Sequence, residues 1–222
     1  MSAARSVLVS ADRIKLYSPV GLRLLDQFTG VAPLGWTEAS LDIGDGNQNW
    51  RETGILPVRT ARGVVCYPGL ERSINVHGRQ PRHYRIRIKA QFYRPLYLAT
   101  DAGVEFLAYP YNDTTPPQHF AEFADNLMLS PAPAYPFPSH VPVLRGVVAD
   151  ASDKPVPNGS VRRGMLEHVL TDERGVYALP LRGVPEGVAT PIDAIEERTG
   201  RHGSISIQLP DALGKSQKIS IK

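Results

Sequence analysis

The fold class is decided by the stretch YRIRIKA at residues 84–90. Its apolar and basic residues alternate strictly, which is typical of a β-strand with one face toward a core and one toward solvent. The core face would carry Tyr84, Ile86, Ile88 and Ala90, and the other face Arg85, Arg87 and Lys89. Short apolar runs, most of them alternating, occur at residues 14–17, 22–25, 64–67, 144–148, 176–179, 205–209 and 219–221. Because Gly, Pro, Asp and Asn separate these runs, the sequence predicts an all-β chain of sandwich type.

The composition of the 222 residues agrees with this fold class. The chain has 19 Gly and 20 Pro, and both residues interrupt long helices. We expect only two brief helices, at residues 118–127 and 193–198. Hydrophobic residues make up 42% of the chain, which is too many for a disordered protein. The 25 basic and 22 acidic residues nearly balance, so no polyelectrolyte character follows.

Cysteine usage and the first residues bear on the compartment. The single cysteine, Cys66, cannot form an intrachain disulfide, which argues against a disulfide-dependent secreted domain. Residues 1–12 hold only a short apolar run at 7–9, whereas a signal peptide needs about 7–15 apolar residues. No window approaches the roughly 18 apolar residues of a membrane span. We therefore expect synthesis in the cytoplasm without a signal peptide, and residence in a virion or an extracellular injection particle.

A domain boundary is predicted at the stretch SPAPAYPFP, residues 130–138. Its prolines cannot donate a regular ladder of N–H groups, so an extended, semi-rigid segment is expected. We predict an N-terminal module at 1–130, a Pro-rich linker at 131–142 and a second module at 143–222. The alternative is an edge segment packed on one module, with Tyr135 and Phe137 as apolar anchors.

The second module resembles the carboxypeptidase regulatory-like, transthyretin-like β-sandwich family. The resemblance is carried by LRGVVAD at 144–150, KPVPNGSV at 154–161 and TDERGVY at 171–177. It extends over residues 144–181, and residues 22–70 repeat the pattern in degenerate form. The resemblance implies a seven-stranded Greek-key sandwich that serves folding, binding or assembly and has no catalytic residues. We therefore predict two tandem Greek-key sandwich modules, transthyretin-like or Ig-like.

Two glycines are predicted to be structural turn residues. Gly63 lies in TARGV at 60–64, and Gly175 lies in DERGV at 172–176. We expect a positive φ at Gly175, which glycine adopts without strain.

Motifs for catalysis or metal binding are not found in the sequence. The six histidines form no His-x-x-x-His pair, and neither a Gly-x-Ser-x-Gly elbow nor a phosphate-binding loop occurs. Cys66 lies in an apolar run and is interpreted as a core residue. We predict no enzyme, no cofactor and no metal. A dioxygenase-like iron site is the enzymatic alternative, and its candidates by residue type are Tyr93, Tyr97, His77 and His83.

The densest charged feature is the basic face of the 84–90 strand. Arg85, Arg87 and Lys89, with Arg94 nearby, are predicted to bind the acidic surface of a partner protein. Alternatively, these basic residues form only a solvated strand face, or they bind nucleic acid or a glycan. A sugar-stacking platform of Trp36, Trp50 and Tyr111 is a further alternative.

These observations favour a non-enzymatic structural or assembly protein. We expect a minor component of a contractile phage tail, a baseplate or a related injection apparatus. Its expected partners are other protein subunits with an acidic surface, and a homo-oligomer is a further alternative. No membrane span and no nucleic acid are expected, whereas a glycan ligand stays open. The alternatives are a carbohydrate- or surface-binding accessory module and a dioxygenase-like metalloenzyme.

Overall fold

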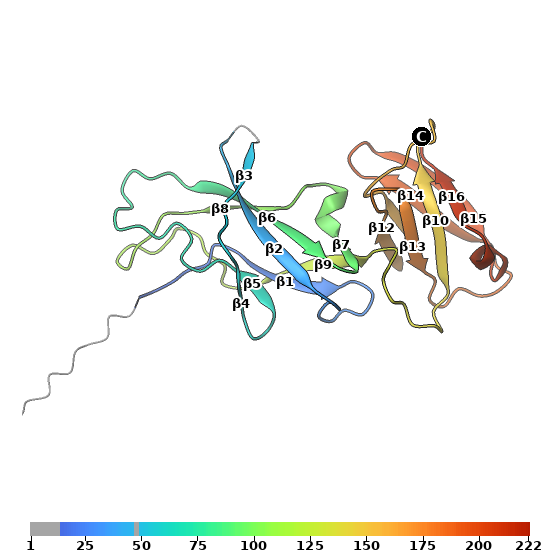
Figure 1. The fold of residues 1–222 in the computed structure, drawn as a ribbon, viewed down its shortest axis with the longest axis horizontal. Helices are drawn as coiled ribbons and strands as arrows, with labels where there is room; N and C mark the ends of the chain where they lie inside the picture. The colour runs from blue at the N-terminus through green and yellow to red at the C-terminus, as the bar shows by residue number, and fades with distance from the viewer. Residues whose placement is uncertain (1–13, 47–48) are drawn as a thin grey trace, which may run out of the picture.

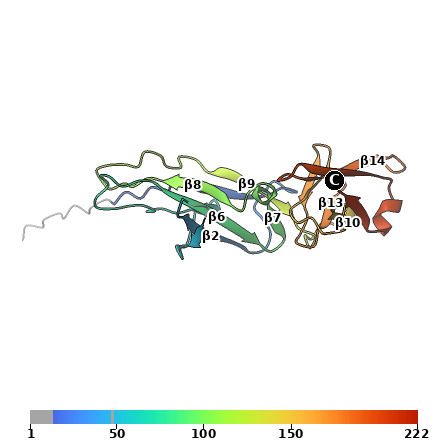
Figure 2. The same ribbon diagram turned by 90° about the horizontal axis from the view of Figure 1, so that it is seen from above.

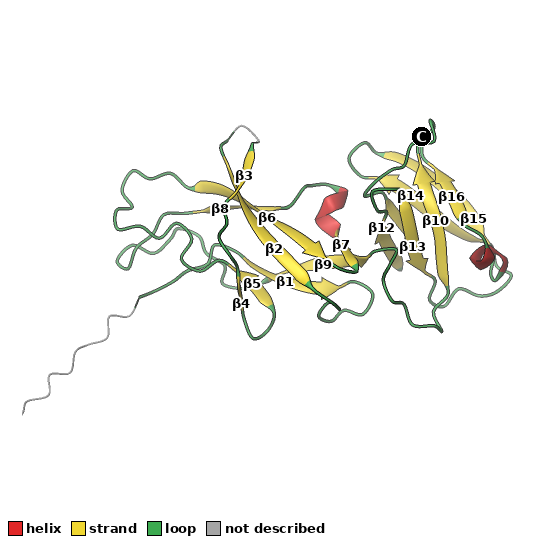
Figure 3. Cartoon of the chain, in the orientation of Figure 1, coloured by secondary structure: helices red, strands yellow, loops and turns green. Residues whose placement is uncertain are grey.

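The computed structural model describes residues 14–46 and 49–222, and the chain is all-β, as predicted (Figures 1 and 3). The N-terminal run at residues 7–9 therefore lies outside the described residues. The first half contains β1 (Gly21–Asp26), β2 (Thr37–Gly44), β3 (Trp50–Glu52), β4 (Val58–Arg59), β5 (Val64–Cys66), β6 (Arg82–Ala90), β7 (Tyr93–Pro95), η1 (Leu96–Ala99), β8 (Val104–Ala108) and β9 (Asp125–Pro131). The second half contains β10 (Val143–Ala149), β11 (Ser160–Arg163), β12 (Glu167–Leu170), β13 (Val176–Pro180), β14 (Thr190–Glu196), β15 (Arg201–Ile207), η2 (Asp211–Gly214) and β16 (Gln217–Ser220).

The first module is built from two sheets. One has the strand order β4-β5-β1-β9-β7 and the other the order β3-β2-β6-β8. All neighbouring pairs are antiparallel except β1 and β9, which run parallel. The core contains Leu22, Leu41, Ile86 and Leu129, each no more than 2% exposed. Tyr84, Ile86 and Ile88 of β6 are buried, which confirms the facing predicted from the alternating pattern.

The second module has its own core and two further sheets. Their strand orders are β13-β10-β16 and β12-β11-β14-β15, and β10 and β16 are parallel. Leu144, Val161, Tyr177 and Ile192 are fully buried in this core. Backbone hydrogen bonds between His202 and Lys222, at 3.2 and 3.1 Å, join the chain end to β15.

Three local expectations were wrong. Residues 14–17 form no strand, because Tyr17 bonds to Gly69 and Tyr111 instead of entering a sheet. The helix expected at 118–127 is irregular chain that leads into β9. The helix expected at 193–198 is the end of β14 and a turn, since the burial of this stretch alternates as in a strand.

The two glycines predicted to be turn residues, Gly63 and Gly175, have φ of 74° and 72°. The positive φ expected at Gly175 is therefore confirmed.

The Pro-rich connection between the modules is packed against the first of them. Tyr135 is 4% exposed, and its hydroxyl donates to the buried carboxylate of Asp26 at 2.7 Å. The ring of Tyr135 also contacts Phe28 and Phe137. The aromatic side chains therefore anchor this segment in the first core.

The two modules lie end to end along the long axis of the molecule (Figures 1 and 2). Arg94 of β7 donates to Glu173 at 2.7 Å and also bonds to Asn158. The hydroxyl of Ser130 accepts the Leu170 N–H at 3.1 Å, and both residues are fully buried. These contacts fix one module against the other. Of the helical segments among the described residues, neither is long and apolar enough to cross a membrane.

Candidate interaction surface

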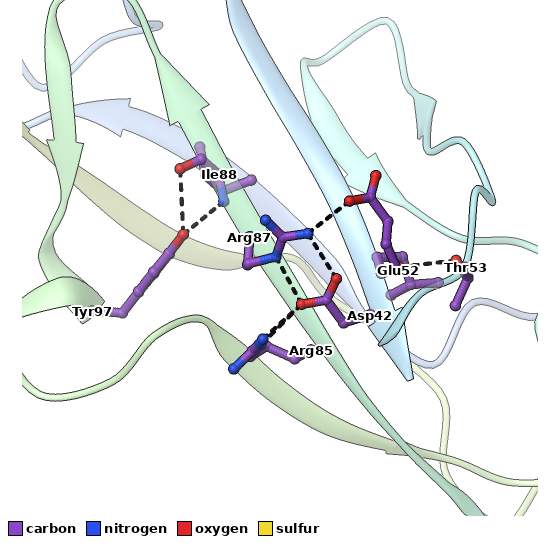
Figure 4. Close-up of polar contacts among 8 residues, drawn as sticks. Asp42, Glu52, Thr53, Arg85, Arg87, Ile88 and Tyr97 are labelled. Atoms are coloured by element: carbon purple, nitrogen blue, oxygen red, sulfur yellow. Dashed lines mark hydrogen bonds and ion pairs between the residues drawn. The ribbon is translucent and has the colours of Figure 1, made fainter. Parts of the chain in front are cut away.

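The arginines of β6 are bound by a carboxylate of the neighbouring strand (Figure 4). The β2–β6 register places Asp42 opposite Arg85. Asp42 is 2% exposed and accepts hydrogen bonds from Arg85 at 2.8 and 3.2 Å and from Arg87 at 2.7 and 2.8 Å. Glu52 accepts a further bond from Arg87 at 2.9 Å. The positive charge of this strand face is therefore largely compensated within the module.

The ion pairs among Asp42, Arg85 and Arg87 shift the pKa values of Asp42 and Arg87. Burial alone would raise the pKa of Asp42, but the hydrogen bonds from Arg87 and Arg85 outweigh it and lower the pKa. The bond to Asp42 raises the pKa of Arg87. The guanidinium of Arg85 also lies 4.5 Å from the centre of the Trp50 ring, which covers it from solvent.

Of the four residues predicted to bind an acidic partner, Arg85, Arg87 and Lys89 lie on one face of β6, whereas Arg94 lies on β7 in the other sheet. Arg85 and Arg87 are held by Asp42, and Arg94 is used in the contact between the modules. Lys89 alone of the four is an exposed residue. The alternating pattern identified the strand face, but no local signal in it indicated the carboxylates that lie across it.

The aromatic platform for a sugar is not assembled. Trp36 is 54% exposed and precedes the first residue of β2, whereas Trp50 pairs with Gly44 at the other end of that strand. Tyr111 is 1% exposed. The three rings therefore do not share one face.

Three of the four residues considered for an iron site, Tyr97, Tyr93 and His83, make separate contacts. The hydroxyl of Tyr97 accepts the Ile88 N–H at 2.6 Å, and that of Tyr93 donates to Asp26 at 3.2 Å. His83 pairs with Glu105 at 3.1 Å. Within residues 14–46 and 49–222, no group of three or more His, Cys, Asp or Glu side chains is arranged to hold a metal ion.

Two side chains with nucleophilic groups are shielded or deactivated. Burial raises the pKa of the Cys66 thiol, which disfavours the reactive thiolate. Ser160 lies 2.7 Å from His168 across the β11–β12 pair, a contact that the sequence analysis missed. Ser160 is fully buried and also accepts from Arg162 at 2.9 Å, so no substrate reaches its hydroxyl.

A cleft of about 430 Å³ opens on the first module between the β3–β4 connection and the loop before β6. We call it the distal cleft. Its apolar wall consists of Ile55, Leu56 and Val58, and its basic side consists of Arg72, which pairs with Asp113, and of Arg79 and Arg82. The apolar residues are 45%, 83% and 49% exposed, which is unusual for such side chains in a monomer when they gather at one place.

Two tyrosines lie beneath the distal cleft. The hydroxyl of Tyr84 donates to Glu71 at 2.6 Å, and Arg82 pairs loosely with the same carboxylate at 3.6 Å. The hydroxyl of Tyr67 is buried and has no hydrogen-bond partner among the described residues. Burial raises the pKa of both tyrosines to about 12, so both stay neutral. The side chain of Arg79 has no ion pair within the described part of the chain.

Comparisons with known proteins find little similarity. No family model and no curated protein matches the chain. Among solved structures, the chain is similar to the Bacillus anthracis TIE protein, with 11% identity and a TM-score of 0.28 over 93% of this chain and 33% of that one. It is also similar to BcpA, the major pilin subunit of Bacillus cereus, with 9% identity and a TM-score of 0.28 over 93% of this chain and 69% of the pilin. The chain thus spans a third of the first protein, and neither likeness is high enough to carry an argument about function.

Proposed function

We propose that the chain is a non-enzymatic structural module that binds other protein subunits in a larger assembly. The observation that carries this proposal is the distal cleft, where exposed apolar side chains gather beside three arginines. Apolar contacts beside arginines are the composition of a protein–protein interface. An acidic protein surface that presents an apolar side chain is the partner that fits it.

The arrangement of the two modules supports the same proposal. A buried hydrogen bond from Leu170 to Ser130 and an exposed ion pair between Arg94 and Glu173 join the modules, so the chain can act as one rigid body in an assembly. The nucleophilic side chains of Ser160 and Cys66 are shielded or deactivated. The particle that we propose from the sequence is a contractile phage tail, a baseplate or a related injection apparatus, with the chain as a minor component.

Sedimentation of the native chain tests the proposal. We would produce the tagged full chain in its source cells and separate the lysate on a density gradient. The chain is expected in fast-sedimenting fractions, and electron micrographs of those fractions are expected to show particles labelled by an antibody to the tag. A chain that is folded but sediments only as a free protein of 24.3 kDa would contradict the proposed function.

A further inference from the structure

The two ends of the molecule carry different surfaces (Figures 1 and 2). The loop at residues 67–81, which lines the distal cleft, reaches the end formed by the first module. The opposite end is formed by the second module and carries η2. Both views place these elements at opposite ends of the long axis.

Two neighbouring loops at the end that carries η2 supply a set of exposed acidic and apolar residues. We call it the terminal patch, and it consists of Glu186, Val188, Asp211 and Leu213. Val188 is 50% exposed and Leu213 38% exposed. The two loops lie together because the Gly187 N–H donates to the Leu209 carbonyl at 3.0 Å.

The charges of the terminal patch are open to a partner. Glu186 and Asp211 are both exposed, and neither has an ion pair within the part of the chain that the structure describes. Lys215 follows η2 directly and is also exposed, so the patch is acidic by a single charge. The distal cleft offers the opposite sign, through the exposed Arg79 and the half-exposed side chain of Arg82.

We propose that copies of this chain bind head to tail, with the terminal patch of one copy in the distal cleft of the next. Leu213 would contact the apolar wall at Leu56, while Asp211 would accept hydrogen bonds from Arg79. This inference rests on the proposed function as an assembly module and specifies a second copy as a partner. Because the two surfaces differ and lie on different modules, the contact is heterologous, and it generates a filament or a ring.

The test uses the purified full chain and two variants, each with one inactivated surface. The cleft variant carries Leu56→Ser and Arg79→Glu, and the patch variant carries Asp211→Arg and Leu213→Ser. Light scattering after size exclusion, at low salt and rising concentration, is expected to give multiples of 24.3 kDa for the unaltered chain. Each variant alone is expected to stay monomeric. An equimolar mixture is expected to form a species of twice 24.3 kDa and nothing larger, because only one active cleft meets one active patch.

Matched controls separate the loss of the contact from the loss of the fold. Arg62→Glu makes the same charge change in the β4–β5 turn, at a residue that lines neither surface, and is expected to assemble like the unaltered chain. Circular dichroism and the melting temperature report whether each variant is folded. Assembly is also expected to weaken with salt, since exposed charges are screened over about 8 Å at physiological ionic strength.

Two outcomes would overturn the head-to-tail contact. One is an unaltered chain that stays monomeric up to about 1 mM, the limit of weak association. The other is a pair of folded variants that do not combine in the mixture although the unaltered chain assembles. A monomeric chain that still enters particles of the source cells would refute this inference and leave the proposed function intact.

Discussion

Replacement of Asp42 by Asn tests whether the arginines of β6 are held by this carboxylate. Asp42 accepts four hydrogen bonds from Arg85 and Arg87, and its own side chain is 3% exposed. Asn has nearly the same shape but no charge, and its NH₂ group would face arginine donors. The variant therefore leaves two guanidinium groups on a half-buried strand face without their counter-charge.

The expected loss of unfolding free energy follows from the burial of the Asp42, Arg85 and Arg87 side chains. Removing one partner of a fully buried ion pair costs about 3–5 kcal/mol. The side chains of Arg85 and Arg87 are 14% and 31% exposed, so water restores part of the loss. We expect a loss of about 3 kcal/mol in the free energy of unfolding of the first module. For a chain of this size, that loss corresponds to a decrease of about 6–12 °C in the melting temperature.

Tryptophan fluorescence during urea unfolding measures this loss selectively. Both tryptophans, Trp36 and Trp50, belong to the first module, so their emission follows its unfolding. Glu38→Gln is the matched control, because Glu38 lies on the same strand and is exposed. Glu38→Gln is expected to change the free energy of unfolding of the first module by no more than about 0.5 kcal/mol.

The pH dependence gives an independent reading of the same interaction. The pKa of Asp42 is lowered in the folded chain from its ordinary value of 3.8. Its contribution is therefore fully present above that value and is lost as the pH falls through the lower pKa of the folded state. The difference between the unaltered chain and Asp42→Asn should be constant from pH 7 to about 5 and should shrink below about pH 4. A loss below about 1 kcal/mol at pH 7, or a difference that persists unchanged to pH 2, would refute the reasoning.

Three further predictions concern the second module and its contact with the first module. Gly175→Val is expected to cost about 3 kcal/mol or more in a thermal melt, because φ is 72° and a Cβ would lie 2.5 Å from the Val148 carbonyl oxygen; an unchanged melting temperature would contradict this turn geometry. Arg94→Ala is expected to leave both melting transitions in place but to broaden the distance distribution in small-angle scattering, whereas an unaltered profile would show that the other contacts suffice. Residues 141–222 alone are expected to give a β-rich circular dichroism spectrum and a cooperative melt of low stability, since their core is complete but small; a disordered spectrum would contradict an independent module.

The strands were predictable where a short local pattern determines their facing. In β6 the alternation of Tyr84, Ile86 and Ile88 with basic residues has only one arrangement with a buried apolar face. The helix expected at residues 193–198 was wrong, because Ile192 and Ala194 of β14 alternate with more exposed neighbours, as in a strand. The sheet buries one face of this stretch, and that tertiary context favours a strand.

The contacts of the candidate surface depend on residues that are distant in sequence. Asp42 lies 43 residues before Arg85, and the register of β2 and β6 is not encoded in either strand alone. The distal cleft combines the loop at 54–57 with residues 67–84. One local signal was present in the sequence: Ile55 and Leu56 form an apolar pair between Gly54 and Pro57, where a turn would ordinarily be polar.

A regular head-to-tail assembly would need a fixed angle between the two modules as well as the two binding surfaces. Each added copy repeats the rotation between the distal cleft and the terminal patch, so a variable angle between the modules would prevent a regular filament or a closed ring. The contact between the modules supplies that constraint through a buried hydrogen bond from the Leu170 N–H to Ser130, the bonds of Arg94 and the Arg182 guanidinium over the Phe28 ring at 4.7 Å. The anchoring of Tyr135 on Asp26 removes freedom from the connection as well. In the proposed head-to-tail assembly, these polar groups would set the geometry that each copy passes to the next, without touching either binding surface.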